Sequence, residues 1–79
     1  MLDEIIDLLR ENVDELEDVT LDADTSLIAS GYMDSYEVVT LLMKLEQAFS
    51  ISIDLDDLSL EDFETPGRIV SMVEGKRGN

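Results

Sequence analysis

The sequence predicts an all-α fold: a small bundle of three main helices plus one short helix, with a long loop between the first two helices. Apolar residues recur at three- and four-residue steps in two long stretches, which is the spacing of one helix face. The 79 residues contain one proline and four glycines, too few turn-forming residues for many short strands. A chain of this length forms one domain, for which we expect residues 1–75, followed by a flexible tail at residues 76–79.

The first helix is predicted over residues 2–17. Acidic side chains occupy most positions between its apolar residues, so the helix has one charged face and one apolar face. We expect the apolar face to pack into the core rather than to bind a partner. This face consists of Leu2, Ile5, Ile6, Leu9, Val13 and Leu16.

Residues 18–33 lack a sustained helical period and are predicted to form the long loop. Thr, Asp and Ser side chains supply turn chemistry there, and loops of this length are uncommon in small domains and are often functional. The apolar residues expected to hold the loop against the core are Leu21, Leu27, Ile28 and Met33.

Part of this loop resembles the opening of a calcium-binding EF-hand loop, at Asp22, Asp24 and Ser26. An EF-hand requires Gly at its sixth position and a bidentate Glu at its twelfth. This chain has Leu27 and Met33 at those positions, so we expect no metal site.

The second helix is predicted over residues 35–49. Asp34 and Glu37 have the spacing of a capping box, with Asp34 as the N-cap residue. Ser35 is then the first helical residue, and its hydroxyl is not needed for capping. It would lie where unpaired backbone N–H groups favour an anion. The apolar stripe of this helix consists of Val38, Leu41, Leu42, Leu45 and Phe49.

The rest of the chain is predicted to contain an extended connector at residues 51–53, one or two short helical turns within residues 55–62, and a final helix. Thr65 and Pro66 form a strong start signal for that helix, as N-cap and first helical residue. Gly75 is placed to end it.

The charge balance excludes several classes of partner. Twenty acidic residues against five basic ones give a formal net charge of −15. Phosphate backbones and anionic lipids repel such a surface, whereas basic protein surfaces attract it. No stretch is apolar enough to span a membrane, and the acidic start of the chain is not typical of a signal peptide, so we expect a cytoplasmic protein.

The chain contains neither Cys nor His. It therefore lacks the commonest general base, and no Ser–His or Cys–His pair can form within it. A hydrolase that uses Ser35 is disfavoured, because nothing in the chain activates the hydroxyl. A serine at a helix start is better suited to modification by an enzyme that brings its own base, although Asp-Ser at such a position commonly serves only as a cap.

The order of these motifs resembles the acyl carrier protein family, including its aminoacyl and peptidyl carriers. The resemblance spans almost the whole chain and includes the acidic first helix, the long loop and the Asp34–Ser35 pair. The other residues that carry it are Thr25, Leu27, Gly31, Val39, Leu41, Leu42, Leu45, Glu46, Phe49, Ile51, Ile53, Phe63–Pro66 and Ile69.

This resemblance implies that a separate phosphopantetheinyl transferase, with magnesium, attaches 4′-phosphopantetheine from coenzyme A to Ser35. The thiol of the arm would hold acyl or aminoacyl intermediates as thioesters. The chain would then be a monomeric carrier rather than an enzyme, and it would raise the effective concentration of its cargo at partner active sites.

The resemblance also implies a docking face for loading enzymes and downstream synthases. Its acids would meet Arg or Lys of the partner, and Val39 and Met43 would supply apolar contact. As alternatives, the acids only solubilise the helices, Glu37 only caps, and Val39 and Met43 are buried at the edge of the core. The predicted partner-binding residues are Asp34, Tyr36, Glu37, Val39, Met43, Glu46, Asp56 and Asp57.

Two departures narrow the role that the resemblance implies. Tyr36 stands where the family commonly has Leu, and both Tyr32 and Met33 separate Gly31 from Asp34. The spacing from Gly31 to Asp34, together with the Phe63–Pro66 stretch, is more similar to stand-alone carriers of D-alanine incorporation or of secondary-metabolite pathways than to fatty-acid carriers. An unmodified acidic helical adaptor that binds basic protein surfaces is the alternative function.

Overall fold

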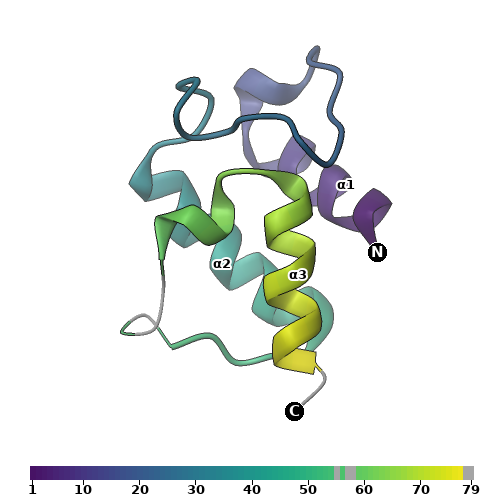
Figure 1. The fold of residues 1–79 in the computed structure, drawn as a ribbon, viewed down its shortest axis with the longest axis vertical. Coiled ribbons are helices and arrows are strands. Elements are labelled where there is room, and N and C mark those ends of the chain that lie inside the picture. The colour runs from purple at the N-terminus through teal and green to yellow at the C-terminus, as the bar shows by residue number, and fades with distance from the viewer. Residues whose placement is uncertain (55, 57–58, 78–79) are drawn as a thin grey trace.

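The computed structural model describes residues 1–54, 56 and 59–77. Three helices form the bundle, α1 (Leu2–Asn12), α2 (Ser35–Phe49) and α3 (Pro66–Arg77) (Figure 1). Two short 3-10 helices, η1 (Asp14–Leu16) and η3 (Leu60–Phe63), complete the described elements. No strand occurs in these ranges, so the predicted all-α bundle with a long first loop is confirmed.

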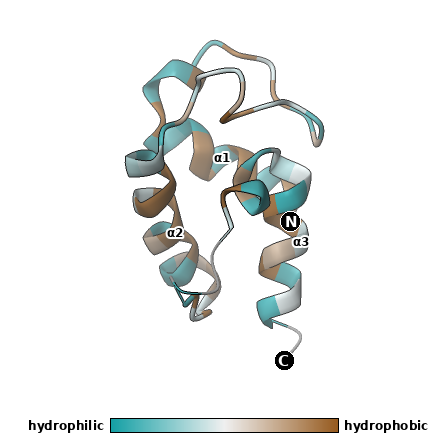
Figure 2. Ribbon diagram, turned by 60° about the vertical axis from the view of Figure 1, so that its left-hand side comes forward, coloured by the Kyte–Doolittle hydropathy of each residue, from teal (hydrophilic) through white to brown (hydrophobic). Residues whose placement is uncertain are grey.

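The core lies where the three helices face one another, since α1 contacts both α2 and α3 and η3 packs against α2 and α3. Hydrophobic and hydrophilic segments alternate along α1 and α2, as Figure 2 shows. No polar side chain is buried among the described residues. The buried apolar residues of the α- and 3-10 helices that form this core are Ile5, Leu9, Leu16, Val38, Leu41, Leu42, Leu45, Phe63, Ile69 and Val73.

The first helix is shorter than the predicted range of residues 2–17. Helix α1 ends at Asn12, whose side-chain amide donates to the Leu8 carbonyl at 2.8 Å. Val13 is extended, with φ −127° and ψ 101°, and η1 follows. Val13 and Leu16 are nevertheless buried as expected. Their three-residue spacing suits a 3-10 turn as well as an α-helix, which is why the periodicity did not reveal the break.

The long loop is held on the core by Leu21, Leu27 and Met33, which are buried, and by Ile28, which is half-buried. The prediction for these four residues is confirmed. Near the end of the loop Gly31 has φ +89°, a conformation that favours glycine. Figure 1 shows the loop crossing one end of the bundle before it enters α2.

The loop also approaches the start of α3 closely, at Ala23 and Gly67. The Gly67 N–H donates to the Ala23 carbonyl at 3.0 Å. A Cβ at residue 67 would lie 2.9 Å from that carbonyl oxygen, so glycine is required by the contact itself.

The final helix begins as predicted and ends later than predicted. The Thr65 hydroxyl accepts the Arg68 N–H at 3.1 Å, and Pro66 is the first residue of α3. The helix continues past Gly75 to Arg77, so the predicted end at Gly75 is wrong. The Arg77 guanidinium lies 5.7 Å from the centre of the Phe49 ring, and a cation in the last helical turn is favourable.

The predicted connector and short helix after α2 are both found, whereas some residues of the predicted turns and tail are not described. Residues 51–53 form a connector without helix, in which Ile53 is buried, and the predicted short helix is represented by η3. Residues 55, 57–58 and 78–79 lie outside the described residues, and so do the parts of the predicted short turns and tail that fall on them.

Candidate functional site

Helix α2 begins with the capping box that the sequence predicts. The Asp34 carboxylate accepts the Glu37 N–H at 2.8 Å, and the Glu37 carboxylate accepts the Asp34 N–H at 3.3 Å. Asp34 itself is extended, with φ −104° and ψ 178°, and Ser35 is the first helical residue. Both cap functions are therefore supplied by residues other than Ser35.

The Ser35 side chain is exposed at this helix start. Its hydroxyl has no hydrogen-bond partner among the described residues, and the chain has no histidine that could act as its base. The hydroxyl is therefore accessible to a second protein but is not activated by this one.

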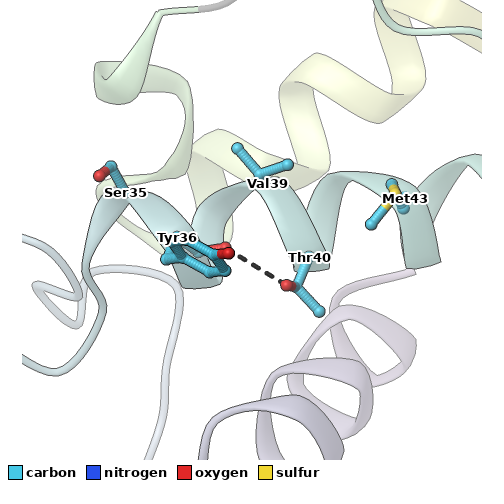
Figure 3. Close-up of a pocket in the computed structure, with 5 residues that line it drawn as sticks. All are labelled: Ser35, Tyr36, Val39, Thr40 and Met43. Atoms are coloured by element: carbon cyan, nitrogen blue, oxygen red, sulfur yellow. Dashed lines mark hydrogen bonds between the residues drawn. The ribbon is translucent and has the colours of Figure 1, made fainter.

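Ser35 lies at one end of an open depression of about 430 Å³ along α2. We call this depression the α2 groove; it is lined by Ser35, Tyr36, Val39, Thr40 and Met43 (Figure 3). No charged side chain lines it, although the molecule carries a net charge of −15. The Thr40 hydroxyl donates to the Tyr36 carbonyl at 3.3 Å, which turns the hydroxyl toward the helix backbone.

The α2 groove exposes large apolar side chains to solvent. Tyr36 is 83 % exposed, Met43 50 % and Val39 41 %. The structure therefore contradicts the alternative prediction that Val39 and Met43 are buried at the edge of the core. A row of exposed apolar side chains beside an accessible serine is suited to contact with another protein.

Glu37 lies on the acidic side of this site. Partial burial raises the pKa of the Glu37 carboxyl, and the negative charges of Glu15, Asp34 and Asp14 raise it further against the lowering effect of the Asp34 N–H. Glu37 caps α2 and is also close enough to Asp14 and Glu15 of η1 for their charges to raise the pKa of its carboxyl. Its part in the cap therefore does not exclude a role in docking.

The other predicted docking acids lie in different settings. The Glu46 carboxylate accepts the Ile53 N–H at 2.9 Å and is half-buried, so it also anchors the connector that follows α2. Asp56 is exposed, and its N–H donates to the Asp54 carboxylate at 2.9 Å. Asp57 lies outside the described residues.

Sequence reasoning assigned no role to Glu64, whose carboxylate accepts the backbone N–H groups of Ile28 at 2.8 Å and Ala29 at 3.1 Å. These hydrogen bonds, led by the one from Ile28, lower the pKa of the Glu64 carboxyl against a smaller effect of burial. The partners are more than 30 residues away in sequence, so no local pattern could have revealed them.

The loop segment that resembles an EF-hand is a turn closed by its own side chains. The Asp22 carboxylate accepts the Asp24 N–H at 2.9 Å and the Thr25 hydroxyl at 3.2 Å. Over residues 1–54, 56 and 59–77, no group of three or more acidic side chains is placed to hold a metal ion. Within the same ranges, no helix combines the length and the hydropathy needed to cross a bilayer.

A helical bundle with an exposed serine at the start of a helix has the arrangement expected of a carrier domain. Comparison with known families gives the same class: the family described as "Phosphopantetheine attachment site" matches residues 3–73. The chain belongs to this family, and its similarity to the acyl carrier proteins is confirmed.

Individual relatives extend the comparison. The chain is 32 % identical over 71 residues to the D-alanyl carrier protein of Lactobacillus delbrueckii subsp. bulgaricus, covering 90 % of this chain and 86 % of the relative. It is 31 % identical over 75 residues to the D-alanyl carrier protein of Staphylococcus saprophyticus, covering 95 % of each. The solution structure of the holo acyl carrier protein from Nitrosomonas europaea superposes with a TM-score of 0.84, at 31 % identity, covering 99 % of this chain and 96 % of that one.

Membership of the family makes this chain a carrier of covalently attached 4′-phosphopantetheine. The residues present fit the group, because Ser35 is exposed and the adjoining α2 groove leaves open space beside it. When attached, the group supplies the thiol that this cysteine-free chain lacks, on which cargo is held as a thioester. Carrier proteins of this kind are generally non-catalytic and interact with a phosphopantetheinyl transferase and with loading enzymes.

Proposed function

We propose that Ser35 is the residue that carries 4′-phosphopantetheine. The observation that carries the proposal is the exposed Ser35 hydroxyl at the first position of α2, left without a partner because Asp34 and Glu37 form the cap. During transfer the hydroxyl loses its proton to a base of the transferase, its oxygen bonds to phosphorus, and the adenine nucleotide half of coenzyme A leaves.

Mass spectrometry tests this assignment. The chain is incubated with coenzyme A, magnesium and a broad-specificity phosphopantetheinyl transferase, and the added mass is measured. We expect one added phosphopantetheine on the wild type and none on Ser35→Ala. Ser71→Ala removes a hydroxyl that is also exposed, from α3, and is expected to be modified normally. Modification of Ser35→Ala would place the arm elsewhere.

We further propose that the cargo is an aminoacyl group and that the chain is a stand-alone carrier of the D-alanyl type. The names of its relatives support this, and so does the loop in which both Tyr32 and Met33 precede Asp34. The modified chain is offered D-alanine with a D-alanine-loading ligase and ATP, and fatty acids with an acyl-loading ligase. Loading with fatty acid alone would contradict the D-alanyl assignment.

The proposed docking face surrounds Ser35 and includes the predicted residues Asp34, Tyr36, Glu37, Val39 and Met43. Exposure of the apolar members supports binding to partners with a basic rim and an apolar centre, and so do the acids beside them, which form no ion pair among the described residues. Glu46, Asp56 and Asp57 remain predictions for the edge of this face. In this proposal the chain performs no catalysis itself.

Docking is tested with Met43→Glu, which places a charge in the α2 groove without entering the core. We expect weaker binding to the loading enzyme and an unchanged melting temperature. Lys44→Glu changes the charge at the next position, which is also exposed, and serves as the control. An unmodified acidic adaptor, the alternative function, would keep its partners after Ser35→Ala and would gain no mass. The monomeric state and the cytoplasmic location stay predictions.

A further inference from the structure

A single carboxylate holds one turn of the long loop. Glu64 follows η3, and its side chain accepts the N–H groups of three consecutive residues, at 2.8 Å from Ile28, 3.1 Å from Ala29 and 3.2 Å from Leu27. The Ser26 hydroxyl lies 3.4 Å from the same carboxylate. Consecutive backbone N–H groups that converge on an anion form charge-assisted hydrogen bonds, which are stronger and more directional than neutral ones.

The main chain of Glu64 reinforces this contact. Its carbonyl accepts the Leu27 N–H at 2.8 Å, so backbone and side chain of one residue hold the same turn. The turn is therefore fixed in position and in orientation against the start of α3. The apolar contacts of the loop with the core are not directional and cannot set its orientation to the same degree.

A short path leads from this turn to Ser35. The Leu27 carbonyl accepts the Met33 N–H at 2.9 Å, which closes the loop between these two residues. Met33 is buried, and the N-cap residue Asp34 follows it directly. Met33, at the end of the loop that leads into α2, is thus hydrogen-bonded to Leu27, which Glu64 holds.

We propose that Glu64 is a positioning residue for modification of Ser35. It does not touch Ser35; it fixes the loop end from which Asp34 and Ser35 enter α2, so that the hydroxyl is presented in one orientation to the transferase. The inference rests on the proposed attachment at Ser35. A misplacement of reacting groups by about 1 Å can slow a reaction by about a hundredfold, so a loosened loop has a measurable effect on rate.

The test compares Glu64→Ala, Glu64→Gln and the control Glu61→Gln in transfer of phosphopantetheine from coenzyme A. Glu61 is exposed, lies one turn earlier and lines the same shallow depression as Ile28 and Ala29. Among the described residues its side chain accepts no hydrogen bond from the loop amides, so its substitution removes the same charge and leaves their bonds to Glu64 in place. Rates are measured by mass spectrometry at a temperature where circular dichroism shows each variant folded. We expect kcat to fall by about tenfold in Glu64→Ala with an unchanged KM for the carrier.

Glu64→Gln keeps one acceptor oxygen, so its kcat is expected to lie between those of the wild type and Glu64→Ala, and it carries the test if the alanine variant does not fold. Amide hydrogen exchange is expected to become faster at residues 27–29 and Met33 in both Glu64 variants and to stay unchanged in Glu61→Gln. An unchanged kcat despite faster exchange would overturn the proposal, as would an effect on KM alone or an equal loss in Glu61→Gln. Failure to modify the wild type would instead overturn the attachment at Ser35.

Discussion

The Asp34 carboxylate accepts the Glu37 N–H at 2.8 Å, and Ser35, the first residue of α2, keeps an exposed hydroxyl without a hydrogen-bond partner among the described residues. The two neighbours thus have separate roles. The Asp34 side chain accepts a hydrogen bond from an N–H group at the start of α2, so modification of Ser35 would leave this cap in place. A carrier needs this separation, because attachment of an arm to the capping side chain would destabilise the helix that presents it.

Asp34→Ala is expected to lower the free energy of unfolding by about 1 kcal/mol, the usual cost of losing an N-cap side chain. For a domain of this size, that corresponds to a fall in melting temperature of about 4–8 °C. Thermal unfolding followed by circular dichroism measures it. Asp34→Asn keeps an acceptor and is expected to lose far less, while Ser35→Ala is expected to melt like the wild type. An Asp34→Ala chain of unchanged stability would mean that Glu37 alone suffices as a cap.

The two glycines of α3 are expected to respond in opposite directions to alanine. Gly67→Ala places a Cβ 2.9 Å from the Ala23 carbonyl oxygen, a backbone atom that cannot move aside without shifting the loop. We expect a loss of about 1–3 kcal/mol in the free energy of unfolding. Among the described residues, a Cβ at Gly75 meets no atom within 4 Å apart from its chain neighbours and the backbone of its own helix, so Gly75→Ala is expected to gain about 0.5–1 kcal/mol. Urea unfolding of both variants measures these changes in the free energy of unfolding. A Gly67→Ala variant more stable than the wild type would show that the loop shifts to make room for the Cβ.

The parts of the fold that the sequence predicts well are fixed by neighbouring residues. Helix α2 runs over the predicted residues 35–49 because its start depends on Asp34 and Glu37, which lie three residues apart, and its apolar stripe is regular. Thr65 and Pro66 set the start of α3 in the same local way. The position of the candidate site follows from these local signals alone.

Distant contacts determined what the sequence did not predict. The Arg77 guanidinium stacks on Phe49, from another helix, and the helix extends past Gly75. Glu64 holds loop amides more than 30 residues away. The exposure of Val39 and Met43 depends on how α1 and α3 pack against α2. Because the apolar side of α2 is broad, its helical periodicity does not determine which apolar residues are covered by the other helices.

Added salt is expected to raise the melting temperature. Within residues 1–54, 56 and 59–77 one ion pair forms, between the N-terminal amine and Glu4 at 3.8 Å, so the acidic groups of a chain with net charge −15 repel one another largely without compensation. Screening by ions weakens this repulsion. Melting in sodium chloride, and in magnesium chloride at matched ionic strength, tests the expectation. A melting temperature independent of salt would contradict it.

Glu37 predicts a specific dependence of stability on pH. Partial burial, together with the charges of Glu15, Asp34 and Asp14, raises the pKa of its carboxyl in the folded state. The folded state then binds the proton more tightly than the unfolded state, so this residue lowers stability as pH rises from the unfolded pKa through the folded one. Below the unfolded pKa, where both states are protonated, the effect is absent.

Glu37→Gln removes this charge but keeps an acceptor for the Asp34 N–H, as a capping box allows. We expect the variant to be more stable than the wild type at neutral pH, and this advantage to vanish below the unfolded pKa of Glu. Urea unfolding across the pH range measures it. Glu74→Gln removes the same charge from an exposed position of α3 and serves as the control. A constant advantage of Glu37→Gln at all pH values would exclude the charge as its cause.

Tyr36 is expected to matter for binding and not for folding. Its side chain is 83 % exposed next to Ser35, so its removal leaves the core intact. Exposed aromatic side chains at the centre of an interface commonly contribute more than 1 kcal/mol, so we expect Tyr36→Ala to weaken binding to the loading enzyme by about tenfold. Isothermal titration calorimetry with the modified carrier measures Kd, and thermal melting confirms an unchanged fold. Leu60→Ala removes another exposed apolar side chain, on η3 and outside the lining of the α2 groove, and is expected to bind normally. Equal affinity of Tyr36→Ala and the wild type would exclude Tyr36 from the docking face.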